Sequence, residues 1–229
     1  VGLIMSSCTQ VDDRGQHHPT MLSLSPRSSS QRNVDHYNTF KKLADEIHKQ
    51  GLCFGVQLAH PGLLSKSYLI QNMEPEGPNT MSISDIERVI DSFATSAYLA
   101  YNYGADAVQI HGASIFLVGS FLSKVTNKRK DEFGGSIEKR CELMRRIIRK
   151  VRSKVPSGFP VLLKINGGTE KAYISPEDQA IISQIAENAG IDAIEIAVEK
   201  KIKEVYPSHF SEFGSEAAHF ASRSNYDYS

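Results

Sequence analysis

The chain has 229 residues, which allows one large domain or two small ones. Lys plus Arg total 26 and Asp plus Glu total 26, so the formal net charge is zero and no overall field attracts nucleic acid or an anionic membrane. The 40% hydrophobic and 23% charged fractions are typical of a globular domain. No apolar run reaches the ~18 residues of a membrane-spanning helix. We therefore expect neither nucleic acid nor a membrane as partner.

The three cysteines, Cys8, Cys53 and Cys141, are odd in number and far apart. This spacing disfavours a disulfide framework or a zinc cluster and favours a reducing compartment, so we expect a cytoplasmic protein. Residues 1–5 are too short for a signal-peptide core. The chain begins with Val and already reads as a strand there, so we expect a fragment.

Short apolar runs alternate with helical patterns along the chain. The predicted strands cover residues 2–5, 53–58, 106–110, 159–165 and 192–197. The predicted helices cover residues 34–49, 84–102, 136–154 and 176–188. We predict a capping box of Ser84 with Glu87, and Ser175 as the N-cap of the last helix. Residues 1–197 should form one domain, and residues 198–229 an irregular tail with a short helix near 215–221.

Strict alternation of about five strands and four helices predicts parallel strands joined by right-handed crossovers. The strands read as nearly continuously apolar, which is typical of a sheet covered on both faces. An open doubly wound sheet and part of an eight-stranded barrel both fit. No Gly-x-Gly-x-x-Gly or P-loop motif is present, which disfavours the nucleotide-binding open sheets. Long loops after the strands are typical of barrel enzymes.

Polar residues gather where the predicted strands end. They are Cys8 in the Ser6–Thr9 run, Gln57 and His60, His111 and Ser114, and Lys164 and Asn166. Neutral hydrogen-bonding groups with one fixed cation suit a planar, polar ligand, and with two imidazoles and no carboxylate we expect no metal site. Purely structural roles are the alternative for Gln57, His111 and Cys8. Lys164 should be exposed or face an anionic group or ligand, because burying an unpaired cation is costly.

The run from Gly104 through His111 to Arg140, including Thr126–Arg129 and Asp131–Ser136, resembles the Old Yellow Enzyme family of NADH:flavin oxidoreductases. The segment Gly55–Gly62 adds a second match. Lys164–Asn166 is similar to the branch that contains the 2,4-dienoyl-CoA reductases. The resemblance covers roughly residues 2–197.

The resemblance implies an FMN-binding (β/α)8 barrel that passes hydride from NADH or NADPH through FMN to an activated alkene, a quinone or oxygen. By position, Gln57 and Lys164 would contact the flavin and Cys8 would lie close to it. His111 and Ser114 would bind the carbonyl oxygen of a small-molecule electron acceptor. Asp131 and Arg140 would brace the site.

The chain departs from the family pattern in two respects. Ser114 stands where the family usually has His or Asn, and Phe116 stands where it has Tyr, so the proton that a tyrosine gives to the alkene carbon has no source. About five of eight barrel strands are expected here; the strands that carry the FMN phosphate site are not among them. The open edge would favour a homo-oligomer.

Two other functions stay open at this point. A truncated barrel that no longer holds FMN would be a non-catalytic remnant. A strand-end lysine in a barrel also permits a Schiff-base aldolase, which no residue besides Lys164 supports.

Overall fold

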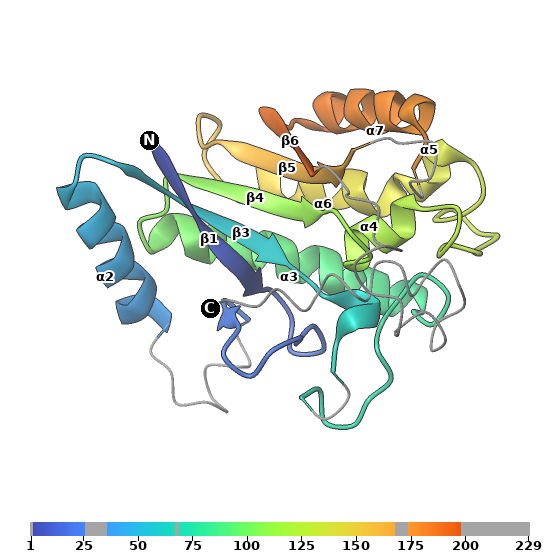
Figure 1. Ribbon diagram of the computed structural model, residues 1–229, viewed down its shortest axis with the longest axis horizontal. Helices are drawn as coiled ribbons and strands as arrows, with labels where there is room; N and C mark the ends of the chain where they lie inside the picture. The colour runs from blue at the N-terminus through green and yellow to red at the C-terminus, as the bar shows by residue number, and fades with distance from the viewer. Residues whose placement is uncertain (1, 26–35, 67–68, 168–173, 198–229) are drawn as a thin grey trace, which may run out of the picture.

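The computed structural model describes residues 2–25, 36–66, 69–167 and 174–197. Within them lies one sheet of six strands, and every neighbouring pair is parallel. Its spatial order is β2 (Leu22–Ser23), β1 (Leu3–Gln10), β3 (Cys53–Ala59), β4 (Ala107–Gly112), β5 (Val161–Asn166) and β6 (Ala193–Ala197). Figure 1 shows the strands side by side as arrows. Apart from the two-residue β2, each strand pairs with the strand that follows it in the chain: β1 with β3, β3 with β4, β4 with β5 and β5 with β6.

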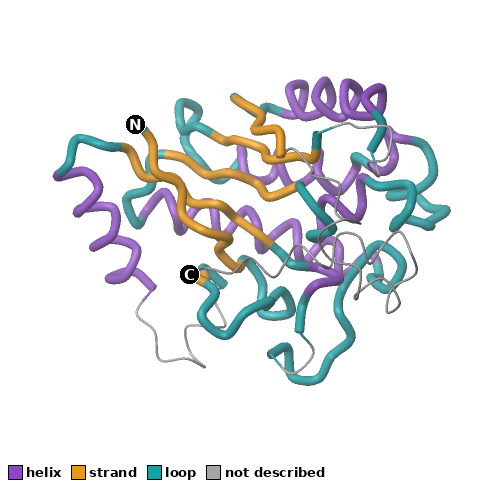
Figure 2. Tube along the Cα trace, in the orientation of Figure 1, coloured by secondary structure: helices purple, strands orange, loops and turns teal. Residues whose placement is uncertain are grey.

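The helices run between the strands. They are α2 (His36–Lys49), η1 (Gly62–Leu64), α3 (Ile83–Asn102), α4 (Leu117–Leu122), α5 (Ile137–Arg140), α6 (Glu142–Arg152) and α7 (Pro176–Ala189). In Figures 1 and 2, α3 and α6 lie behind the sheet, and α7 packs beside α6. Right-handed crossovers that always advance in one direction put their helices on one face of the sheet. A doubly wound sheet reverses direction and covers both faces, whereas the five longer strands here advance in one direction, so their order defines part of a (β/α)8 barrel.

The hydrophobic core lies between the sheet and these helices. On β3 the core side chains, which are 0–1% exposed, are Phe54, Val56 and Leu58. They alternate along the strand with Gly55 and Gln57. The same alternation on β4 and β5 puts Val108, Ile110, Val161, Leu163 and Ile165 into the core. The expectation of strands apolar on both faces is therefore wrong for β4 and β5, because their other face carries polar side chains.

Several predicted boundaries are also wrong. The first strand runs to Gln10, so Cys8 lies inside it, next to a register shift between Met5 and Cys8. The described residues contain six strands, because the two-residue β2 adds to the five expected. The predicted helix 136–154 is interrupted at Cys141. Helix α4 and the single turn η1 were not expected.

The N-cap of α3 is Ser82, not Ser84. The Ser82 side chain accepts from the Asp85 backbone N–H, and the Asp85 carboxylate accepts from the Ser82 N–H. The segment Ser82–Glu87 contains two overlapping box patterns, and the structure uses the earlier one. Asp85 of that box also pairs with Arg14. Ser175 caps α7 as predicted, and Gly190 ends that helix in the left-handed conformation, with φ of 112°.

The last two expectations concern membrane-spanning helices and the C-terminal tail. Among the described residues, no helix has both the length and the apolarity needed to cross a membrane. The tail at 198–229 and its helix near 215–221 lie outside the described residues.

Candidate functional site

The polar face of the sheet carries the predicted site residues at neighbouring register positions. Cys8 pairs in register with Gln57, and Gln57 with Gln109. Two residues further along β4, His111 pairs in register with Lys164, which in turn pairs with Glu195 on β6. Because side chains two residues apart on a strand share a face, these groups lie on one side of five adjacent strands.

Hydrogen bonds join five of these side chains into a row. The Cys8 thiol donates to Gln57 Oε1 at 3.0 Å, and Gln57 Nε2 donates to Gln109 Oε1 at 2.6 Å. Gln109 Nε2 donates to Glu195 Oε2 at 2.8 Å, and Lys164 Nζ lies 2.7 Å from Glu195 Oε1. Lys164 thus faces an anionic group, which is one of the two outcomes expected for it.

Burial is greatest in the middle of this row, because Cys8 at one end is only half-buried. Gln57 and Gln109 are 8% and 2% exposed, whereas the side chains of Lys164 and Glu195 are 27% and 48% exposed. At the Cys8 end, desolvation raises the pKa of the half-buried thiol to about 11, although the charge of Lys164 opposes this. The thiol therefore stays protonated near neutral pH and acts as a donor to Gln57 rather than as a nucleophile.

His111 is the buried imidazole of this face. Burial, and then the charge of Lys164, lower its pKa from the ordinary 6.5 to about 4, so the ring is neutral at pH 7. The ring of Phe116 stacks on it, with centroids 4.3 Å apart. Among the described residues, His111 Nδ1 has no hydrogen-bond partner. A buried nitrogen without a partner is costly, so this atom is available to a polar ligand.

Ser114 lies at the turn between β4 and α4. Its φ of 55° is in the left-handed region, an uncommon conformation for a residue other than glycine. Its backbone N–H donates to Asn166 Oδ1 at 2.8 Å, which ties this turn to the end of β5. The predicted residues His111, Ser114, Lys164 and Asn166 are thus brought to one end of two neighbouring strands.

Sequence reasoning missed two members of the row, Gln109 and Glu195. The expectation that no carboxylate lies at this edge is wrong, because Glu195 faces Lys164 directly. The signal was present: both residues are polar positions inside otherwise apolar strands, and Gln109 precedes His111 by two residues, on the same strand face.

Arg140 and Asp131 hold the loop after α4. Arg140 donates to the carbonyl oxygens of Leu122 and Gly135 at 2.8 Å each and pairs with Asp178 at 2.6 Å. Asp131 accepts from the Arg129 side chain and, at 3.0 Å, from the Phe133 N–H. These contacts hold the loop in place; the bracing of the site that we expect of both residues stays a prediction.

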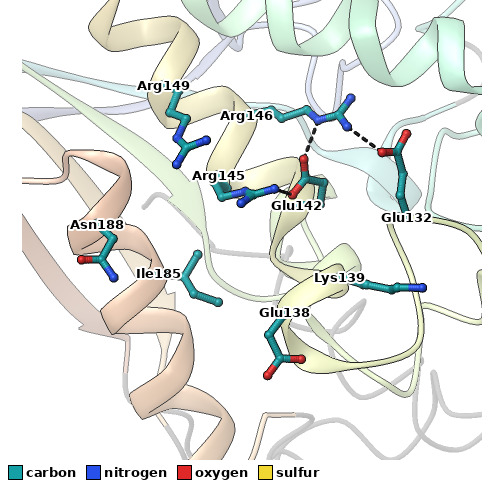
Figure 3. A pocket seen from close by; sticks show the side chains of 9 residues that line it. All are labelled: Glu132, Glu138, Lys139, Glu142, Arg145, Arg146, Arg149, Ile185 and Asn188. Carbon is teal, nitrogen blue, oxygen red and sulfur yellow. Dashed lines mark hydrogen bonds and ion pairs between the residues drawn. The ribbon is translucent and has the colours of Figure 1, made fainter.

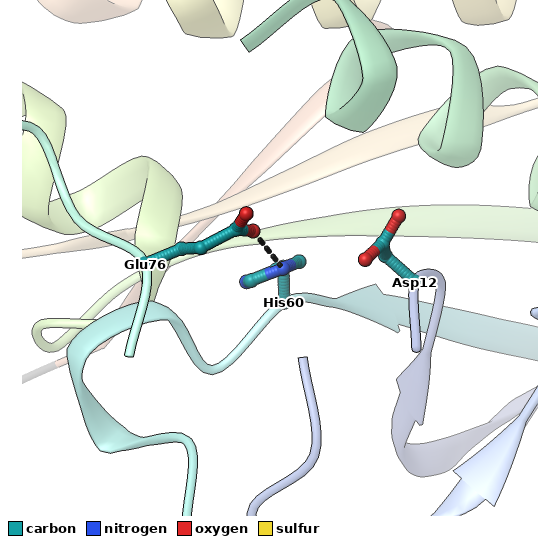
Figure 4. Close-up of side chains that lie close together, drawn as sticks. All are labelled: Asp12, His60 and Glu76. Carbon is teal, nitrogen blue, oxygen red and sulfur yellow. Dashed lines mark ion pairs between the residues drawn. The ribbon is translucent and has the colours of Figure 1, made fainter. Parts of the chain in front are cut away.

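His60 belongs to a buried charged cluster rather than to this row. Its Nε2 lies 3.3 Å from Glu76 Oε2, and Asp12 lies close by, as Figure 4 shows. Arg88 pairs with both carboxylates, and Arg14 pairs with Glu76 at 3.1 Å. Burial opposes ionisation of Asp12, but the charges of His60 and Arg88 outweigh it and lower the pKa of that carboxyl.

The ligand atoms of Asp12, His60 and Glu76 lie within 4.8 Å of one another, close enough to surround a metal ion. The contacts argue against that use. The Gly62 N–H donates to His60 Nδ1 at 3.0 Å, so that ring nitrogen is occupied, and the other, Nε2, faces Glu76. The Arg88 guanidinium already pairs with both carboxylates, and Arg14 pairs with Glu76 as well. The cluster is therefore a buried ion-pair network that joins the loops after β1 and β3 to α3.

Figure 3 shows a groove that is lined by residues of α5, α6 and α7, together with Glu132. Charged residues line it, and two of its arginines are paired: Arg145 with Glu142, and Arg146 with Glu142 and Glu132. None of the residues predicted for the site lines this groove, so we do not assign the site to it.

The fold and the site define a partial parallel α/β barrel with a row of polar side chains across one face of its sheet. Residues 1–222 match the family model described as the NADH:flavin oxidoreductase / NADH oxidase family. The chain belongs to that family, as the sequence motifs predict.

Two curated relatives are each 30% identical to this chain. One is the NADH-dependent flavin oxidoreductase iliE of Hypocrea jecorina (strain QM6a), matched over 86% of this chain and 55% of the relative. The other is an NADPH dehydrogenase of Geobacillus sp. (strain WCH70), matched over 91% of this chain and 62% of the relative. The chain thus spans somewhat more than half the length of these two relatives.

A solved structure shares the fold. The old yellow enzyme homologue from Zymomonas mobilis superposes with a TM-score of 0.75 at 21% identity, over 86% of this chain and 60% of that one. At this identity the likeness establishes the fold, which agrees with the partial barrel described above.

Proposed function

We propose that this chain is the main part of an FMN-dependent oxidoreductase that takes hydride from NADH or NADPH and delivers it to a small-molecule acceptor. The observation that carries the proposal is the placement of Gln57, His111 and Lys164 on one face of three adjacent strands, in a chain of this family. The curated relatives are named for NADH- and NADPH-linked activities, which supports the same class of reaction.

The donor set fits a flavin. The Gln57 amide uses one N–H and one carbonyl lone pair within the row, so one donor and one acceptor remain for a ligand edge that carries both. Lys164 gives one of its three N–H groups to Glu195 and keeps two. When bound, FMN would supply hydride transfer between the nicotinamide and the acceptor. Lys164 would supply positive charge beside it, and Cys8 would stay a protonated neighbour.

His111 and Ser114 would bind the acceptor. The neutral His111 ring, with Nδ1 unpartnered among the described residues, can donate one hydrogen bond to a carbonyl oxygen. Such a bond stabilises negative charge that develops on that oxygen. Phe116 beside it has no proton to give, so acceptors that need no proton at carbon, such as quinones and oxygen, suit this site better than alkenes.

Flavin binding tests this proposal. Titrating the purified chain into FMN should quench flavin fluorescence, and NADH or NADPH should then bleach the bound flavin in the absence of oxygen. Gln57→Leu and Lys164→Met should weaken binding about tenfold each, from the loss of hydrogen bonds to a charged or polar ligand. Lys130→Met, at an exposed lysine, is the matched control. Absence of quenching at millimolar FMN would reject the proposal and favour the non-catalytic remnant.

The three cysteines are free, and we propose a reducing, cytoplasmic location on that ground. We also propose that the chain acts without nucleic acid, since its net charge is zero. The edge strands of the described sheet have unpaired backbone groups, which favours a homo-oligomer. Size-exclusion chromatography with light scattering measures the oligomeric state directly.

A further inference from the structure

From Cys8 to Glu195 the hydrogen bonds of the polar row run in one direction. The Cys8 thiol donates a hydrogen bond to the carbonyl oxygen of Gln57. The NH₂ group of Gln57 in turn donates to the carbonyl oxygen of Gln109. Gln109 repeats this pattern toward Glu195. The row ends on the Glu195 carboxylate, which also accepts from Lys164 on its other oxygen.

The carboxylate determines this direction. The Lys164 hydrogen bond lowers the pKa of Glu195, with a smaller contribution from Gln109, so the group is ionised and can only accept. Gln109 must therefore turn its NH₂ toward Glu195 and its carbonyl toward Gln57. Gln57 must in turn point its NH₂ at Gln109 and its carbonyl at Cys8.

Burial prevents either amide from reversing its orientation alone. Gln109 is 2% exposed and Gln57 is 8% exposed, so little water is available to satisfy an amide that turned over alone. A reversed Gln57 would set its carbonyl oxygen against the carbonyl oxygen of Gln109. Either every member of the row keeps its orientation or the whole row reverses together.

We infer that Glu195 is a positioning residue for the cofactor site: through Gln109 it fixes which atoms of Gln57 face the ligand, and at the same time it anchors the Lys164 ammonium. The identity of the ligand rests on the proposed function, whereas the positioning rests on the row itself. Neither Gln109 nor Glu195 needs to touch the ligand for this role.

Replacing Glu195 by Gln makes the inference testable. Lys164 and Gln109 contact different oxygens of the Glu195 carboxylate. A glutamine keeps only one of these positions as oxygen, so one of the two partners would face an NH₂ group instead. If the carbonyl stays with Lys164, the new NH₂ faces Gln109 and the row must reverse. Gln109→Met provides a second variant, because it disconnects Gln57 while the pair of Lys164 and Glu195 stays intact.

The first measurement needs no flavin. In ¹⁵N–¹H spectra of the purified chain, we expect the side-chain NH₂ resonances of Gln57 to shift in both variants, and their exchange with water to quicken about tenfold as protection is lost. Glu187→Gln is the matched control, because Glu187 accepts from Gln184 at 3.2 Å on the exposed surface of α7. If Gln57 is unchanged in Glu195→Gln and Gln109→Met, the inference is overturned.

The second measurement adds FMN. We expect Glu195→Gln and Gln109→Met to weaken binding about three- to tenfold, with Glu187→Gln unchanged. If the unmodified chain binds no FMN while the Gln57 resonances still respond to Glu195→Gln, the proposed function fails and the positioning role stands. If FMN binds equally to all variants and Gln57 does not respond, the positioning role fails and the proposed function stands.

Discussion

The ring of Phe116 lies against the imidazole of His111, with ring centroids 4.3 Å apart and planes inclined by 19°. Phe116 is 8% exposed and so is His111, so each ring shields the other from water. This packing gives the imidazole the apolar surroundings that disfavour its charged form. A stacked pair at the end of β4 therefore controls both the shape of the candidate site and the protonation of its histidine.

This burial should make stability depend on pH in a defined direction. The pKa of His111 is about 4 in the folded chain and about 6.5 when unfolded, so between these values the unfolded state binds the extra proton. Stability should fall as pH decreases from about 6.5 to about 4, by up to about 3 kcal/mol from this group.

Urea unfolding at pH 7 and pH 4 measures that loss. The His111→Leu variant should lose about 3 kcal/mol less than the unmodified chain over this interval, since every other titrating group is common to both. His18→Leu, at an exposed histidine, should lose as much as the unmodified chain. Equal losses in all three proteins would contradict the low pKa of His111.

The ion-pair network around His60 should respond strongly to removal of its cation. Arg88 contacts both Asp12 and Glu76, which are each 7% exposed. Arg88→Met leaves two buried carboxylates without their main partner, so we expect a loss of about 3 kcal/mol in the free energy of unfolding. The control is Arg149→Met on the exposed side of α6, where a change below about 0.5 kcal/mol is expected. Similar losses in the two variants would refute the role of the network.

Much of the fold could be predicted from the sequence because the apolar runs and helical periods are strong and regular. The five longer strands and the helices α2, α3 and α7 were predicted in this way, and α5 and α6 were predicted as one helix. Short elements could not be: β2 has two residues and exists because Leu22 and Ser23 pair with β1, a contact that local sequence does not encode. Helix α4 is likewise short, and all six of its residues are buried, so it has no polar face to reveal a period.

The site was predictable where a residue type is unusual for its place in a strand. Gln57, His111 and Lys164 interrupt apolar runs, and the structure places all three on one face. Glu195 was missed because a carboxylate near the end of a strand also fits a solvent-exposed position, and nothing local shows that Lys164 stands beside it in register. The cluster of Asp12, His60 and Glu76 unites three segments far apart in sequence, which only the packing of loops against α3 brings together.

The N-cap of α3 can be tested directly, because two serines compete for it in the sequence. Ser82 accepts from the Asp85 backbone N–H at 3.2 Å, whereas Ser84 hydrogen-bonds only to the Ser82 hydroxyl among the contacts described. Ser82→Ala should therefore cost about 1 kcal/mol of stability. Ser84→Ala should cost less than about 0.5 kcal/mol, measured by the same urea titration. The reverse order would restore the capping box of Ser84 with Glu87.

Phe116 also offers a test of acceptor choice. Its ring, at the start of α4, already lies against His111, so a hydroxyl at its para position would be carried close to the proposed acceptor site. In the family, the residue that the resemblance aligns here is a tyrosine that gives a proton to the alkene carbon. We therefore expect Phe116→Tyr to raise the rate of alkene reduction at least about tenfold, since positioned proton transfer contributes roughly 10²- to 10⁴-fold.

The readout is the ratio of two rates measured with the same flavin-loaded protein: NADPH oxidation by 2-cyclohexen-1-one and by menadione, both without oxygen. Quinone reduction needs no proton at carbon, so its rate should stay within about twofold and serves as the internal control for folding and flavin content. A parallel fall in both rates would mean that the hydroxyl disturbs the stack on His111. An unchanged ratio with both rates intact would mean that Phe116 does not occupy the proton-donor position, and the alkene carbon would then have to lie elsewhere on this face.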